Sequence, residues 1–243
     1  CVLSDCLGTM AKIAHTLGHL DEATIFASQR DTLNVQIHNA FFHATDTTYA
    51  TGSPLDMAYP LLVGAVPASL HSAVVQRIIA SCYGRFNGHI AGGLVGTAIF
   101  TQWAILQGQS QPEPSQLVYN MLKQRSYPGY LYMIDNNATT TWEYWNGERS
   151  HVHNCYNGIG LWFYQALGGI RPTDDGVGYQ RVIIAPQCPK EVTWATTTRQ
   201  TPYGLLRTEW RGSQLKAQIP VGVEAEVVWR GKRHIVGSGE WMF

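Results

Sequence analysis

The chain has 243 residues, of which 45% are hydrophobic and 14% charged, and its formal net charge at pH 7 is zero. This composition supports a sizeable core and excludes an intrinsically disordered chain. Balanced charge without a basic run gives no sign of a nucleic acid or an anionic membrane surface as partner. No apolar run is long enough to span a bilayer. The five cysteines are scattered without a CxxC pair, so we expect free thiols.

The first half of the chain predicts helical hairpins. Apolar residues recur at helical spacing from Leu3 to Leu17, and Gly18 ends the run. A second helix over 22–42 completes the hairpin. Further helices are expected over 56–63, 68–83, 97–107 and 112–123, with a glycine-rich loop over 86–97 and an aromatic loop over 127–133. The chain begins inside the first helical pattern without Met, so we expect it to be part of a longer protein.

The last third predicts strands. An apolar helix over 158–167 stops at Gly168 and Gly169, and the periodicity then changes from helical to alternating around 171–178. Short strands are expected over 180–185, 192–197, 205–210, 215–219, 225–229 and 234–236. The predicted fold class is therefore a multidomain α and β protein. Helical hairpins occupy 1–172 and a small antiparallel β-sandwich occupies 173–243.

Between these parts, 136–157 reads N-N-A-T-T-T-W-E-Y-W-N-G-E-R-S-H-V-H-N-C-Y-N. Its turn-forming residues interrupt any helix and predict a loop that carries function. Carboxylates among tryptophans suit sugar chemistry, because acids transfer protons and aromatic faces stack on a pyranose ring. Glu143, between Trp142 and Tyr144, is the candidate base. Glu148 is a candidate acid because it is near in sequence, although N-G-E-R is typical of a solvated turn.

Other chemistries fit this loop less well. His151, His153 and Cys155 alternate and could converge on a metal ion, but a fourth ligand is not evident, so we predict no metal and no cofactor. Cys155 lacks the signals of a thiol nucleophile. The glycine-rich loop over 86–97 fits neither nucleotide-binding pattern. Two purely structural explanations stay open. His153 could be a buried histidine that is hydrogen-bonded to the backbone, and the tryptophans could pack beneath the loop without contacting a sugar.

The chain resembles the α-L-rhamnosidases of glycoside hydrolase family 78. The matching segments, in order, are Y-P-G-Y-L-Y-M at 127–133, A-T-T-T-W-E at 138–143, S-H-V-H at 150–153, W-F-Y at 162–164 and G-I-R-P at 169–172. Val152 stands where the family usually has Asn, and Tyr130 stands where Trp is common.

The resemblance implies that 1–172 is the C-terminal part of an (α/α)6 barrel and that 173–243 is the trailing β-sandwich. Family members are inverting hydrolases that release terminal α-L-rhamnose, so the implied substrate is a rhamnosylated glycan or glycoside. By the family pattern Glu143 acts as general base and His153 contacts the sugar. Trp142, Trp145 and Tyr130 are further candidate substrate-binding residues. The general acid would lie upstream, in a missing N-terminal part of the same protein.

Two alternatives of other classes remain. One is a carbohydrate-binding or assembly fragment without catalysis, since an incomplete barrel exposes an apolar helical flank. The other is a related helical-barrel enzyme, a lyase or a phosphorylase, in which the upstream part would supply a uronate or phosphate site.

Overall fold

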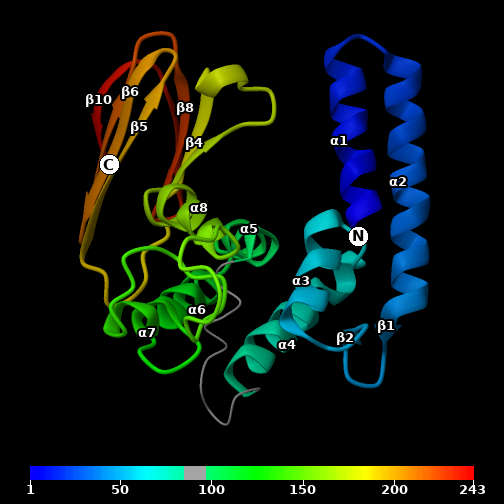
Figure 1. Cartoon of the computed structure of the whole chain (residues 1–243). Helices are drawn as coiled ribbons and strands as arrows, with labels where there is room; N and C mark the ends of the chain where they lie inside the picture. The colour runs from blue at the N-terminus through cyan, green and yellow to red at the C-terminus, as the bar shows by residue number, and fades with distance from the viewer. Residues whose placement is uncertain (85–96) are drawn as a thin grey trace. The chain divides into compact units, whose positions relative to one another are not determined.

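The computed structural model describes residues 1–84 and 97–243 (Figure 1). The chain divides into two compact units, Cys1–Leu94 and Val95–Phe243. The second unit contains both helices and strands, so this division does not follow the change of secondary structure, and the domain boundary at 172/173 stays a prediction. Most of the predicted glycine-rich loop over 86–97 lies outside the described residues.

The first unit begins with the predicted helical hairpin. Helix α1 (Val2–Thr16) and helix α2 (Leu20–Phe41) lie side by side in Figure 1. Gly18, which follows the end of α1, has φ +82°, a conformation that glycine adopts without steric cost. The unit continues with strands β1 (Phe42–His43) and β2 (Thr48–Tyr49), helix α3 (Pro54–Val63), 3₁₀ turn η1 (Ala68–Leu70) and helix α4 (His71–Gly84). The two short strands were not predicted.

The apolar stripe that predicts α1 is largely exposed. Met10, Ile13 and Leu17 are exposed by 43%, 46% and 68%, whereas the buried residues of α1 are Ser4 and Ala14. Ser4 is buried because its hydroxyl donates to Asn34 of α2. The helices of the hairpin therefore pack through a partly polar contact, and residues 1–84 and 97–243 leave the apolar side of α1 exposed.

The helical part of the second unit contains α5 (Ala98–Gln107), α6 (Glu113–Leu122), α7 (Tyr130–Asp135), η3 (Asn157–Ile159), α8 (Gly160–Trp162) and η4 (Phe163–Leu167). Two predictions were wrong here. The expected aromatic loop over 127–133 is helical from Tyr130. The expected single helix over 158–167 is a 3₁₀ turn, one α-turn and a π-turn, and the N–H of Gly168 closes the π-turn on the Phe163 carbonyl at 2.9 Å.

Strands β1 and β2 pair with each other, and the strands of the second unit form two four-stranded sheets that share one hydrophobic core. One sheet has the order β10-β7-β6-β5 and the other β3-β4-β8-β9. The bounds are β3 (Ile170–Pro172), β4 (Arg181–Ile184), β5 (Trp194–Thr201), β6 (Gly204–Arg211), β7 (Gln214–Ile219), β8 (Glu224–Trp229), β9 (Lys232–Val236) and β10 (Gly239–Met242). All six predicted strands are present. Buried and more exposed side chains alternate along β4, β6, β7 and β8, whereas β9 is exposed over its first four residues.

The sandwich differs from the prediction in two respects. Strands β3 and β10 were missed, because β3 has only three residues including Arg171 and Pro172, and all four residues of β10 are exposed. Strand β4 pairs with β8 in parallel, so the sheet is mixed and not purely antiparallel. Parallel neighbours need a long crossover, and here the chain forms β5, β6 and β7 of the other sheet between β4 and β8.

The sandwich is tied to the end of the helical segment. The indole N–H of Trp210 donates to the Leu167 carbonyl, and the hydroxyl of Thr208 donates to the Gly168 carbonyl, both at 2.8 Å. A β-carbon on Gly168 would come within 2.3 Å of the Thr197 hydroxyl oxygen, which explains the glycine. This attachment positions the preceding loop relative to the sandwich. Across residues 1–84 and 97–243, no helix combines the length and apolar character needed to cross a membrane.

Candidate active site

The loop that follows α7 is folded back on itself by its own backbone. The N–H of Glu143 donates to the Ser150 carbonyl at 2.8 Å, and the N–H of His153 donates to the Thr141 carbonyl at 2.9 Å. Residues 141–143 and 150–153 therefore form two antiparallel arms. The turn between them contains Gly147 at φ +81° and Arg149 at φ +62°. The predicted loop is confirmed, and it places Glu143 and His153 on facing arms.

A cluster of aromatic side chains packs against the two arms. Trp142 and Trp145 are buried, with 6% and 8% of their surface exposed, and pack with Met133. Trp145 stacks on Tyr156 at 3.9 Å between ring centroids and meets the edge of Tyr130 at 5.1 Å. Such ring contacts add to the burial of apolar surface, so they hold the loop in one geometry.

Tyr130 is fixed by its hydroxyl as well as by its ring. The phenol donates to the Tyr156 carbonyl at 2.5 Å. Burial raises the pKa of the Tyr130 phenol far above its ordinary value, with a smaller contribution from Cys155. Tyr130 is therefore a neutral donor that joins α7 to the end of the loop.

The Glu143 carboxylate is partly exposed and faces hydrogen-bond donors. The N–H of Ser150 lies 3.4 Å from Oε2, and the Arg149 guanidinium lies 3.7 Å from Oε1. The side chain is 27% exposed, so water reaches it, while Arg149 is 66% exposed and stacks over the Tyr144 ring at 5.0 Å. The carboxylate thus accepts a long hydrogen bond from the Ser150 N–H and forms an ion pair with Arg149, and a carboxylate open to water in this way can serve as a base that receives a proton.

A depression of about 560 Å³ lies beside the arms, and we call it the loop hollow. Its lining residues are Thr140, Thr141, Val152, His153, Asn154 and Asn157. His153 lines it from one arm, and its Nδ1 accepts the N–H of Cys155 at 3.2 Å. Glu143 is not among the lining residues, although it follows Thr141 by two positions.

The other candidates of the loop lie elsewhere. Glu148 is exposed in the turn, where its N–H donates to Asn146 Oδ1 at 3.2 Å. His151 stacks on Trp142 at 5.0 Å, and its Nε2 donates to the Gly147 carbonyl at 2.7 Å. His151 is thus committed to the turn. Among the described residues, no group of three His, Cys, Asp or Glu side chains has the spacing of a metal site.

Three residues beside the site were missed by sequence reasoning. Arg149 and Ser150 contact the Glu143 carboxylate. Asn157 lies 2.8 Å from the Thr141 hydroxyl and lines the loop hollow. Only the density of polar residues after Glu143 could have pointed to them, because their roles depend on how the arms pair.

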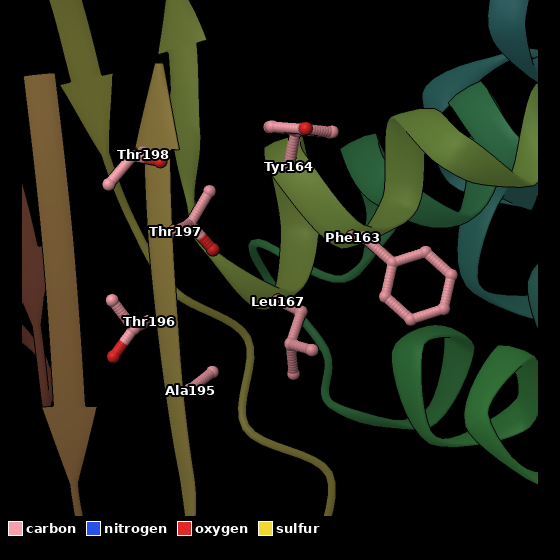
Figure 2. A pocket seen from close by; sticks show the side chains of 7 residues that line it. All are labelled: Phe163, Tyr164, Leu167, Ala195, Thr196, Thr197 and Thr198. Carbon is pink, nitrogen blue, oxygen red and sulfur yellow. The ribbon is translucent and has the colours of Figure 1, made fainter. Parts of the chain in front are cut away.

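A second hollow, of about 280 Å³, lies between η4 and β5 in the same unit. In Figure 2 Ala195 and Thr197 face the helical segment, whereas Phe163 points away from the strand. The lining side chains are aromatic, aliphatic or threonine, and none of them is a carboxylate, an imidazole or an amine. Acid–base chemistry therefore points to the loop that carries Glu143 and His153 and not to this hollow.

Comparison with known families agrees with these features. Residues 1–167 match the family model described as the bacterial alpha-L-rhamnosidase 6 hairpin glycosidase domain. The chain belongs to this family. Residues 169–240 match the bacterial alpha-L-rhamnosidase C-terminal domain. The resemblance inferred from the sequence is therefore confirmed, as is the fold class of a six-hairpin helical domain followed by a β domain.

Individual rhamnosidases support the same assignment. The chain is 28% identical over 234 residues to an alpha-L-rhamnosidase of Alteromonas sp. (strain LOR), and 27% identical over 240 residues to one of Formosa agariphila. Each match covers 89% of this chain and 24% of the relative. The crystal structure of native α-L-rhamnosidase from Aspergillus terreus superposes with a TM-score of 0.83 at 25% identity, over 96% of this chain and 28% of that one. The chain thus spans about a quarter of the length of these rhamnosidases.

Proposed function

We propose that the protein containing this chain hydrolyses terminal α-L-rhamnosides with inversion, and that Glu143 is its general base. Membership of the rhamnosidase family supports the substrate class. The observation that carries the role of Glu143 is its carboxylate: partly exposed, directed at the donors Ser150 N–H and Arg149, and fixed above a buried aromatic cluster.

In the proposed reaction Glu143 takes a proton from water while the oxygen of that water attacks the anomeric carbon. The bond between the anomeric carbon and the leaving oxygen breaks, and a second carboxylic acid protonates that oxygen. Inverting enzymes hold the two carboxyl groups roughly 6.5–9.5 Å apart, which leaves room for the water. We propose that this acid is supplied by the part of the protein that lies upstream of these residues.

The remaining predicted residues divide into two groups in this proposal. His153 contacts the sugar from the loop hollow. Trp142, Trp145 and Tyr130 contribute chiefly by holding the two arms, because the indoles are buried and the Tyr130 phenol is bonded to the Tyr156 carbonyl. Whatever sugar contact they make would come from ring edges.

The test is Glu143→Gln in the complete protein, with Glu148→Gln as matched control in the same loop. We expect Glu143→Gln to lower kcat on an aryl α-L-rhamnoside by at least about a hundredfold, the lower range for a general base, and Glu148→Gln to leave it near the parent value. Proton NMR during turnover should detect β-L-rhamnose first. Unchanged kcat in Glu143→Gln would refute the role of Glu143, and α-L-rhamnose as first product would refute inversion.

A second proposal follows from the exposed stripe of α1. Met10, Ile13 and Leu17 are spaced for one helical face and are exposed within this chain. We propose that this face packs against another part of the same longer protein, since related rhamnosidases are about four times the length of this chain. This is the assembly role that the sequence left as an alternative, combined here with catalysis.

A further inference from the structure

The two ring nitrogens of His153 have different roles. A backbone N–H can only donate, so the Nδ1 that accepts the Cys155 N–H at 3.2 Å must carry a lone pair. The proton of the neutral imidazole then sits on Nε2. Nε2 has no hydrogen-bond partner among residues 1–84 and 97–243. His153 therefore offers the loop hollow a donor.

The hydroxyl of Thr141 fixes the orientation of Asn157. Thr141 Oγ1 lies 2.5 Å from the His153 carbonyl oxygen and 2.8 Å from Asn157 Oδ1, and its one hydrogen is shared between these two acceptors. The amide oxygen of Asn157 is therefore turned toward Thr141, and the amide NH2 group lies on the other side. That NH2 group has no hydrogen-bond partner in the described part of the chain.

The loop hollow also has an apolar wall. Val152 is 75% exposed, which is unusual for a branched aliphatic side chain, and it lines the same hollow. The hollow thus combines two donors, His153 Nε2 and the Asn157 NH2, with one isopropyl group. A 6-deoxyhexose combines ring hydroxyls, which both donate and accept, with a methyl group.

We propose that Asn157 and Val152 determine the specificity of the loop hollow. In this proposal, which rests on the proposed function above, the Asn157 amide NH2 donates a hydrogen bond to a sugar hydroxyl while His153 Nε2 donates to a second one. Val152 contacts the sugar methyl. A sugar with a hydroxymethyl group at that position would place a hydroxyl against the isopropyl group, which offers it no hydrogen-bond partner, and would lose the apolar contact that the methyl makes.

The experiment compares Asn157→Ala and Val152→Ser with Asn146→Ala in the complete protein. Asn146 is the matched control, because it is an exposed asparagine of the same loop that does not line the hollow. The readouts are kcat/KM on aryl α-L-rhamnoside and aryl α-L-mannoside, which differ in the hydroxyl at C6, and Ki for free L-rhamnose. Thermal unfolding of each variant checks that the fold is kept, which exposed positions should allow.

We expect Asn157→Ala to lower kcat/KM for the rhamnoside and raise Ki for L-rhamnose by about tenfold, as for one lost hydrogen bond. Val152→Ser should reduce the preference for rhamnoside over mannoside by about tenfold. If Asn157→Ala behaves like Asn146→Ala, or the preference survives in Val152→Ser, the inference is overturned while the proposed function stands. If the parent protein does not hydrolyse the rhamnoside, the proposed function fails first and this inference with it.

Discussion

Gly147 lies at the turn between the two arms of the loop, and its replacement by alanine tests how that turn supports Glu143. The residue has φ +81°, where side chains with a β-carbon are strained. A β-carbon at this position would also lie 3.0 Å from the indole ring of Trp142, closer than carbon atoms pack in protein interiors. Trp142 cannot retreat freely, because it stacks on His151 and is buried in the aromatic cluster.

The two effects can be separated with a matched variant. Gly212 also has a positive φ, +57°, but a β-carbon there would have no neighbour within 4 Å. Gly212→Ala should therefore report the backbone strain alone, about 1 kcal/mol. Gly147→Ala adds the crowding of a packed ring, which typically costs about 1–3 kcal/mol. Its total destabilisation should be roughly 2–4 kcal/mol.

Urea unfolding of this chain measures both values, and kcat of the complete protein reports the consequence for Glu143. A displaced Trp142 moves its neighbour Glu143, so we expect Gly147→Ala to lower kcat at least about tenfold while Gly212→Ala leaves it unchanged. Equal destabilisation of the two variants would refute the proposed crowding of Trp142. Normal kcat in a clearly destabilised Gly147→Ala would refute the link between the turn and Glu143.

Two further predictions concern the first unit. Burial raises the pKa of the Tyr49 phenol to about 12, so the folded state binds more protons than the unfolded state between pH 10 and 12, and stability should fall as pH rises through this window. In urea titrations from pH 9 to 11.5, the free energy of unfolding of Tyr49→Phe should fall less steeply with pH than that of the parent chain, by up to about 1.4 kcal/mol per pH unit. The same slope in both proteins would contradict the prediction. Replacing Met10, Ile13 and Leu17 by Ser should reduce self-association of this chain at unchanged melting temperature, yet lower the melting temperature of the complete protein. The control Ile37→Ser replaces a buried residue, so it should lower the melting temperature of this chain and of the complete protein. If the triple variant lowers the melting temperature of this chain as much as Ile37→Ser does, the stripe is packed inside the chain and the prediction is wrong.

The sequence predicted most of the elements because their patterns are local. Strands β4, β6, β7 and β8 alternate buried and more exposed side chains, and the α1–α2 hairpin has an apolar period interrupted by Gly18. The failures concern features outside the local pattern. Residues 158–167 are helical as their composition indicates, but the N–H of Gly168 bonds to the Phe163 carbonyl five residues back, so the last turn is a π-turn. Strand β3 is held by pairing with β4 and not by its own three residues.

The candidate site shows the same limit in its chemistry. Composition alone indicated sugar chemistry around Glu143, and the family pattern supplied the roles of Glu143 and His153. Neither could predict the hydrogen-bond directions, because these depend on contacts across the loop. The Cys155 N–H selects the tautomer of His153, and the Thr141 hydroxyl orients Asn157, yet no short motif contains this arrangement. The order of residue types along the chain can therefore indicate the reaction. Selectivity among sugars depends on which hydrogen-bond donors and acceptors remain unpaired after the two arms of the loop have paired.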